Sequence, residues 1–145
     1  MEDIKEQVIY YLSKRKFITL ATSSISGIPL THPVAYVNKG ANIYISTSSQ
    51  SRKVKNMQEN RKVAYSVYDE TEHLDEIISV QMEGEATFVT DEGESNEILN
   101  IMNKKFPFMA NIPIDSDNVI IKITPKTCHF SDYTKRFGHR DKVDF

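Results

Sequence analysis

The sequence has almost no cysteine and lacks any long apolar run. Its single cysteine, Cys128, has no second thiol with which to form an internal disulfide. No apolar run approaches the ~20 residues that a membrane-spanning helix requires. The segment before Phe17 is charged and lacks the apolar core of a signal peptide. These absences exclude a disulfide scaffold and predict a protein of the reducing cytoplasm that does not contact a membrane.

The chain also lacks an excess of charge of either sign. It carries 18 basic and 20 acidic residues, which are interspersed, and its formal net charge is −2. Nucleic-acid-binding surfaces are usually basic, so we expect no nucleic-acid partner. The 145 residues, 39% of them hydrophobic, suffice for one substantial core. The sequence therefore predicts a single domain over residues 1–145, with an N-terminal helix within 1–14 and a tail over 134–145.

No hydrolytic or metal-binding constellation is evident. Cys128 and His129 are neighbours in a predicted strand, so their side chains point to opposite faces of a sheet. The other histidines are His32, His73 and His139, and the four together lack the spacing of metal ligands. No glycine-rich nucleotide-binding loop is present. A chain without its own acid–base set is typical of a protein whose cofactor supplies the chemistry.

Alternating apolar residues predict a mainly β protein with flanking helices. The predicted strands cover residues 17–23, 28–37, 43–45, 61–68, 77–90, 119–124 and 127–133. One helix is predicted over 3–14, where apolar residues recur at helical spacing. A later helix is predicted over 92–106, after a capping box formed by Asp91 and Glu94. Gly84 interrupts the longest strand and indicates a bulge or the close approach of another backbone.

The segment that follows residues 43–45 favours an anion. A polar run from Ser46 to Ser51 leads into a helix that Ser48, Ser49 or Ser51 can cap and that carries Arg52 and Lys53 in its first turn. The free amides and the dipole at a helix N-terminus attract negative charge. Arginine adds a fork of donors and lysine a point charge. A phosphate monoester of a cofactor would fit, and a capped helix with two solvated cations is the alternative.

Thr47 followed by Ser51-Arg52-Lys53 resembles the T-x-x-x-S-R-K signature of the pyridoxamine 5′-phosphate oxidase family, the FMN-binding split barrels. The downstream Asn60-Arg61 before Val63-Ala64 is also similar, and so is the later segment Val80–Ala86, VQMEGEA. The resemblance extends from about Phe17 to Tyr133. It implies an antiparallel split β-barrel of about six to seven strands.

The resemblance also implies an FMN site. Ser51, Arg52 and Lys53 would hold the phosphate, and Ser46 and Thr47 would face the flavin ring or the ribityl chain. The second strand would pass the ring edge with His32, Pro33, Val34 and Ala35. An edge strand whose prolines prevent aggregation is the alternative for this segment. Gln81 on the longest strand would reach the cofactor of a partner subunit, in a homodimer with two cofactor sites built from both chains. The loop 106–113 is either a wall of the pocket or part of the core.

The predicted function is FMN-dependent oxidation or reduction of a small molecule. The true oxidases place an arginine and a lysine on the second strand, where this chain offers His32 and Tyr36. Arg136, His139 and Arg140 only loosely resemble the C-terminal segment that holds the oxidase substrate, and a frayed tail is the alternative. These departures argue against the vitamin B6 reaction and leave the reduction of quinones, nitro compounds or other acceptors.

Two further hypotheses remain. One is a haem-binding or haem-degrading split barrel, in which His32, His129 or His139 would be the axial ligand. The other is a non-enzymatic barrel that binds a flavin, a protein partner or an oligonucleotide.

Overall fold

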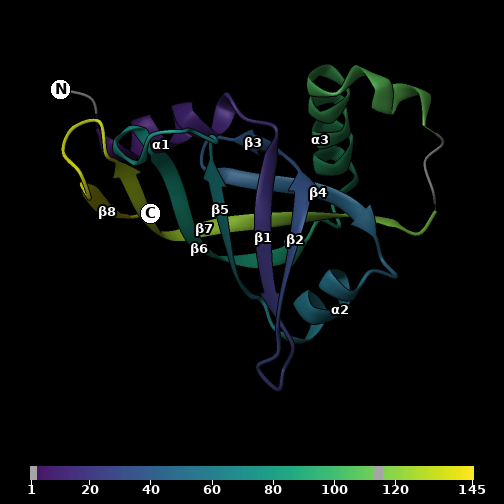
Figure 1. Cartoon of the computed structure of the whole chain (residues 1–145). Helices are drawn as coiled ribbons and strands as arrows, with labels where there is room; N and C mark the ends of the chain where they lie inside the picture. The colour runs from purple at the N-terminus through teal and green to yellow at the C-terminus, as the bar shows by residue number, and fades with distance from the viewer. Residues whose placement is uncertain (1–2, 113–115) are drawn as a thin grey trace.

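The computed structural model describes residues 3–112 and 116–145, which form one curled antiparallel sheet with helices around it (Figure 1). The elements are, in chain order, α1 (Ile4–Ser13), β1 (Phe17–Ser23), β2 (Pro29–Ala35), β3 (Val37–Lys39), β4 (Asn42–Ser48), α2 (Arg52–Glu59), β5 (Lys62–Tyr68), the 3-10 turn η1 (Leu74–Glu76), β6 (Ile78–Phe88), α3 (Glu92–Lys105), the 3-10 helix η2 (Pro107–Asn111), β7 (Asn118–Asp132) and β8 (Arg140–Asp144). The strand order is β2-β1-β5-β6-β7-β4-β3, and β8 pairs with β7 outside this path.

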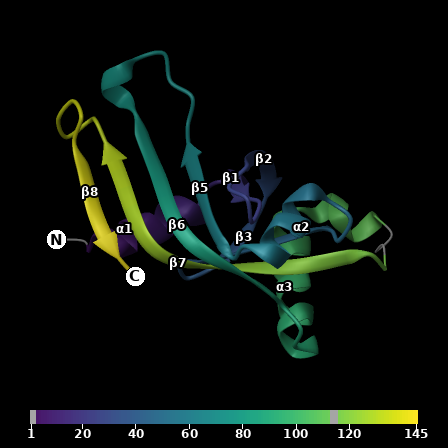
Figure 2. The ribbon, with the colours of Figure 1, turned by 90° about the horizontal axis from the view of Figure 1, so that it is seen from below.

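The long strand β7 joins the two halves of the sheet. It pairs with β6 over residues 121–132, with β4 over 118–123 and with β8 over 127–131. Since a strand has only two edges, β4 and β8 lie on the same edge of β7, at its opposite ends. Figure 2 shows β7 bending between these two ends. The sheet therefore curls, and each half packs its own helices.

The main core lies inside the curl. Val8, Tyr11 and Leu12 of α1 are buried there, in contact with apolar side chains from the strands. The Tyr11 hydroxyl donates to the Ile78 carbonyl at 3.1 Å, and the Tyr36 hydroxyl donates to the Leu12 carbonyl. Apolar burial supplies most of the stability of such a core, and the two hydroxyls fix where α1 sits. The prediction that an N-terminal amphipathic helix covers the barrel is confirmed.

A second, smaller cluster attaches α3 to β3 and β4. Its buried members are Val37, Tyr44, Ile98, Met102 and Phe106. The Tyr44 hydroxyl donates to the Glu94 carboxylate at 2.9 Å, and burial together with this bond raises the pKa of Tyr44 to about 12. Asp91 caps α3 by accepting from the Glu94 amide at 2.8 Å, as its capping-box pattern predicts. The result is a helix held rigidly beside the end of β4.

The fold class is confirmed, and three strand predictions need correction. The strand predicted over 43–45 continues through Ser48 as β4, so the first part of the polar run from Ser46 to Ser51 belongs to the strand and the chain turns after it. The predicted strand 28–37 is divided into β2 and β3, and the predicted strands 119–124 and 127–133 are one strand, β7. Pro125 lies between the two predicted strands, and proline has no amide to donate to a ladder. The pairing instead shifts register here: Glu83 faces Thr127, whereas Gly84 faces Pro125. A bulge thus accommodates the proline within a continuous strand.

The C-terminal tail is ordered, and the alternative of a frayed end is wrong. Residues 140–144 form β8, and the Phe145 amide donates to the Lys126 carbonyl at 2.8 Å. The turn before β8 is closed by the Asp132 amide, which donates to the His139 carbonyl at 3.1 Å. Backbone bonds to β7 order this segment, although its charged composition does not signal a strand.

No helix among the described residues is long and apolar enough to cross a membrane. A cytoplasmic location stays a prediction.

Gly84 occupies a position with no room for a side chain. A Cβ there would lie 2.6 Å from the Thr124 carbonyl oxygen and 3.1 Å from Ile123 Cγ2. We expect Gly84→Ala to lower the free energy of unfolding by about 1–3 kcal/mol, because the β6–β7 bulge would have to open. Urea denaturation measures this change. Gly93→Ala in α3 is the control, since its Cβ would lie 3.2 Å from Asp91 Oδ2, a side-chain atom that needs to move only by a few tenths of an ångström and can keep its capping bond, and alanine favours helix. Equal losses in free energy of unfolding for Gly84→Ala and Gly93→Ala would contradict the inference that Gly84 has no room for a side chain.

Candidate functional site

The junction of β4 and α2 forms the centre of the candidate site. Of the serines proposed as helix caps, Ser51 is the one used: its Oγ accepts from the Val54 amide at 3.4 Å. The Ser51 amide donates to the Ser48 carbonyl at 3.1 Å, which closes the turn after β4. Residues in the first turn of a helix have amides without partners inside that helix. The strand thus delivers the chain into a capped helix whose N-terminus faces the end of β4.

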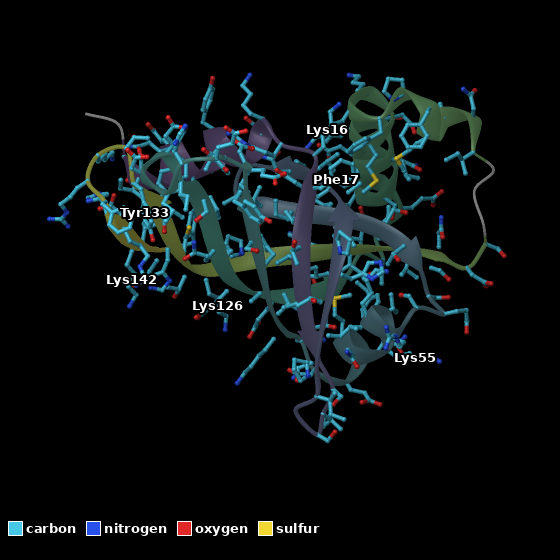
Figure 3. All side chains as sticks on the ribbon, viewed as in Figure 1. Lys16, Phe17, Lys55, Lys126, Tyr133 and Lys142 are labelled. Carbon is cyan, nitrogen blue, oxygen red and sulfur yellow. The ribbon has the colours of Figure 1, made fainter. Side chains whose placement is uncertain are left out.

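Lys53 is the unusual residue of this helix. It is only 7% exposed, and no hydrogen bond or ion pair to another described residue neutralises its ammonium. Burial lowers its pKa, since desolvation disfavours the charged form. By contrast, Lys55 is exposed and extends from α2 into solvent (Figure 3). A buried cation without a partner is costly, and an anionic ligand would supply the missing charge.

Lys53 lines a pocket of about 220 Å³ that we call the Lys53 pocket. Its walls come from β2, β4, α2, α3 and η2, which meet at one end of the sheet (Figure 1). The structure brings six of the predicted cofactor residues together here: His32, Val34, Ala35, Ser46, Thr47 and Lys53. Residues from two separate strands and one helix thus converge as the resemblance implied.

Four other predicted cofactor residues do not line this pocket. The Ser51 hydroxyl is engaged in capping α2, and Arg52 lines a neighbouring hollow beside the turn between β1 and β2. Pro33 is exposed and pairs in register with Thr19 of β1. Gln81 lies on β6, where its Nε2 donates to Ser79 Oγ at 2.6 Å. The role of Gln81 therefore stays a prediction that requires a second chain.

Four further residues line the pocket. They are Tyr36, Met102, Phe106 and Met109. Met102 and Phe106 belong to the apolar stripe of α3, which the helical spacing predicted as core. Phe106 and Met109 belong to the apolar loop 106–113, for which a wall of the pocket and part of the core were the two expectations. Both residues line the pocket, and Phe106 is also buried in the second cluster with Met109 packed against it. Pro113 of that loop lies outside the described residues.

A second buried lysine lies next to this wall. Lys105 Nζ has no hydrogen-bond partner and lies 4.1 Å from the centroid of the Tyr36 ring. Burial, together with the nearby charge of Lys16, lowers the pKa of Lys105 to about 8. Its ammonium is enclosed by the protein, so it cannot contact a ligand directly. Its charge nevertheless adds to the positive potential around the pocket.

The predicted substrate residues of the tail lie far from the Lys53 pocket of their own chain. Arg136 and His139 belong to the turn before β8, and Arg140 pairs with Ser131. Ser46 of the pocket instead pairs with Ile120, at the opposite end of β7. The eleven residue steps from Ile120 to Ser131 correspond to about 36 Å of extended strand. Figure 3 shows the same separation between Tyr133 and Lys142 at one end and Lys55 at the other.

Only one of the predicted haem ligands lies at the pocket. His32 lines it, and the His32 side chain is exposed. His129 pairs in register with Gln81 on another part of the sheet, and His139 Nε2 lies 3.0 Å from the Asp141 carboxylate. In the described part of the chain no group of three or more His, Cys, Asp or Glu side chains could hold a metal ion.

Comparison of the sequence with known protein families gives one match. The family model described as pyridoxamine 5′-phosphate oxidase matches residues 4–132. No curated protein matches the chain in sequence.

Three solved structures have similar folds. The haem storage protein HutZ from Vibrio cholerae has a TM-score of 0.73 and 16% identity, over 86% of this chain and 92% of its own. A putative pyridoxamine 5′-phosphate oxidase from Listeria innocua has a TM-score of 0.75 and 15% identity, over 88% and 98%. An FAD-binding protein from Mesorhizobium loti has a TM-score of 0.68 and 16% identity, over 88% and 92%. At these identities the likeness concerns the fold alone.

Proposed function

The chain belongs to the pyridoxamine 5′-phosphate oxidase family, and from this premise we propose that it binds FMN in the Lys53 pocket and oxidises or reduces a small molecule. The observation that carries the proposal is the largely buried Lys53, which lines the pocket and whose ammonium has no anionic partner among the described residues. A phosphate group would supply that partner and would also accept from the first-turn amides of α2.

The remaining residues of the pocket fit the rest of a flavin phosphate. Ser46 and Thr47 present hydroxyls beside Lys53, suited to the polyhydroxyl chain of the cofactor. Val34, Ala35 and Phe106 give an apolar wall, suited to a ring system. The flavin would supply electron or hydride transfer, and these residues would bind it, orient it and limit its contact with water.

The size of the pocket argues that a second chain completes the site. Its volume of about 220 Å³ lies below the ~300–1,000 Å³ of typical cofactor and ligand sites. Within one chain it can enclose only part of FMN. The outer face of the sheet next to β2 carries Thr19, Ser66 and Gln81 in one cross-strand row. We propose a homodimer that buries this polar row, with cofactor sites shared between the two chains.

One experiment tests both parts of the proposal. The purified protein is mixed with FMN and sedimented, with absorbance followed at flavin and at protein wavelengths. Flavin absorbance is expected to sediment with a species of about twice the 16.6 kDa chain mass. Flavin that remains unsedimented at concentrations well above micromolar would refute FMN binding. Flavin that sediments with a single chain would refute the shared site.

Haem binding is the second candidate, because His32 lines the same pocket as Lys53. An imidazole is a suitable axial ligand, and a buried lysine could pair with a haem propionate. The similar fold of a protein described as a haem storage protein gives this reading additional support. Adding haemin to the apo-protein distinguishes the two candidates. A sharp Soret band that His32→Ala removes, with no flavin bound, would favour haem.

A further inference from the structure

We propose that a second pocket, beside the Lys53 pocket, binds an uncharged and mainly apolar small molecule. This α3 pocket lies between α3, η2 and the ends of β4, β6 and β7, and its volume is about 480 Å³. That volume lies within the ~300–1,000 Å³ typical of small-molecule sites. Three residues of one face of α3 border it at helical spacing: Ser95, Leu99 and Asn103.

The chemistry of the lining indicates the class of the occupant. Among the residues that the structure describes, 3–112 and 116–145, none of those that line the α3 pocket carries a charge. Phe88, Leu99, Val119 and Ile120 give it an apolar surface, and Asn103 adds an amide. A charged group placed there would lose its hydration and gain no ion pair, which is strongly unfavourable. An uncharged molecule would gain free energy from burying its apolar surface and would lose little by leaving water.

The two pockets are contiguous. Ser46 and Met109 line both of them, Ser46 from β4 and Met109 from η2. A molecule in the α3 pocket would therefore lie beside whatever occupies the Lys53 pocket. The inference has two parts. That the α3 pocket binds a small molecule rests only on its lining residues. That this molecule is the substrate, which exchanges electrons with the flavin, rests on the proposed flavin site.

The two pockets differ in charge. Lys53 lines the first pocket and is absent from the second. An anion would therefore bind in the Lys53 pocket, and an uncharged ring in the α3 pocket. The arrangement predicts that the two ligands bind together and do not compete.

Two probes with the same rings test the inference. N-phenyl-1-naphthylamine is neutral, and 8-anilinonaphthalene-1-sulfonate carries one negative charge on a closely related skeleton. Titration of the FMN-loaded protein, followed by probe fluorescence, is expected to give at least about tenfold tighter binding of the neutral probe, because the sulfonate would be desolvated without a partner. Without FMN the sulfonate could instead bind at Lys53, so the preference is measured with FMN bound.

Matched substitutions in α3 locate the probe. Asn103→Trp would fill the α3 pocket and is expected to weaken binding of the neutral probe by at least about tenfold, because the cavity volume is lost. Asn100→Trp is the control, since Asn100 is exposed on the same helix and does not line the pocket. Ser95→Trp is a second filling variant, for use if Asn103→Trp does not fold. Neither Ser95 nor Asn103 lines the Lys53 pocket, so both variants are expected to retain FMN binding.

The outcomes separate this inference from the proposed function. If the neutral probe binds and Asn103→Trp removes it while FMN does not bind, the α3 pocket stands and the flavin proposal fails. If FMN binds but the anionic probe binds as tightly as the neutral one, the inference is overturned. It is also overturned if Asn103→Trp and Asn100→Trp have the same effect on the neutral probe.

Discussion

Replacing Arg52 and Lys53 together by alanine is expected to weaken FMN binding by roughly 10- to 1000-fold, since each charge-assisted bond contributes about 1.5–3 kcal/mol. Riboflavin lacks the phosphate, so it should bind the parent weakly and lose little affinity in the variant. Lys53 is expected to account for most of the loss, because Arg52 lines the neighbouring hollow. Fluorescence titration with both flavins measures the effect.

Lys55→Ala is the matched control. Lys55 lies on the same helix with the same charge, but it is exposed and does not line the Lys53 pocket. Its removal should leave the affinity for FMN within about twofold of the parent, as expected for an exposed charge outside the pocket that is screened by salt. An equal loss of FMN and riboflavin binding in the double variant would mean that Arg52 and Lys53 act on folding and not on the phosphate.

The pH dependence of binding gives a second readout. Burial holds the pKa of Lys53 below that of an exposed lysine, so the ammonium loses its proton at a lower pH than usual. FMN affinity should therefore fall as the pH rises through this lowered pKa, and the Lys53→Ala variant should lack that fall. Bound phosphate would shift the same pKa upward, because a nearby anion favours the charged form.

The same lysine should cost stability in the absence of a ligand. Since its pKa is lower in the folded chain than in the unfolded chain, the unfolded chain binds the proton more tightly. The loss in free energy of unfolding is greatest at pH values below the pKa of Lys53 in the folded chain. It disappears as the pH rises to the pKa of this lysine in the unfolded chain. A lysine retained at such a cost is typical of a functional site, where stability is given up for binding.

The parts of the site that the sequence could predict depend on neighbouring residues. The cap at Ser51, the capping box at Asp91 and the place of Gly84 follow from backbone chemistry within a few positions. The convergence of the β2 and β4 residues came from the family signature, because their contact depends on the whole sheet. Local sequence patterns predict a single helix or strand and its turns, and they do not predict which strands lie side by side.

The parts that were missed depend on distant pairing. Four of the five residues of β8 are charged: Arg140, Asp141, Lys142 and Asp144. Considered without the rest of the chain, such a segment resembles a solvated tail. It is a strand because residues 127–131 of β7 offer a free edge, and that edge is not visible in the local sequence. The contribution of Met102 to the pocket wall was equally hidden. An apolar residue facing a pocket and one facing the core have the same pattern.

We expect the FMN-loaded protein to turn over pyridoxamine 5′-phosphate at well below the roughly 1 per second of ordinary enzymes. That substrate carries its own phosphate, which needs cations beyond those committed to FMN. β2 supplies His32 to the Lys53 pocket and no arginine or lysine, and the α3 pocket is uncharged. The remaining candidates, Arg136, His139 and Arg140, lie at the other end of β7.

Only the tail of a partner subunit could bring these residues to the site, and the structure gives them other contacts. His139 is paired with Asp141, and Arg140 belongs to β8. Ordinary turnover of pyridoxamine 5′-phosphate by the FMN-loaded protein would contradict the prediction. Arg136→Ala and Arg140→Ala would then test the partner's tail directly. They are preferable to deletion of residues 135–145, which would also remove β8 and its bonds to β7 and so confuse a substrate contact with the stability of the sheet.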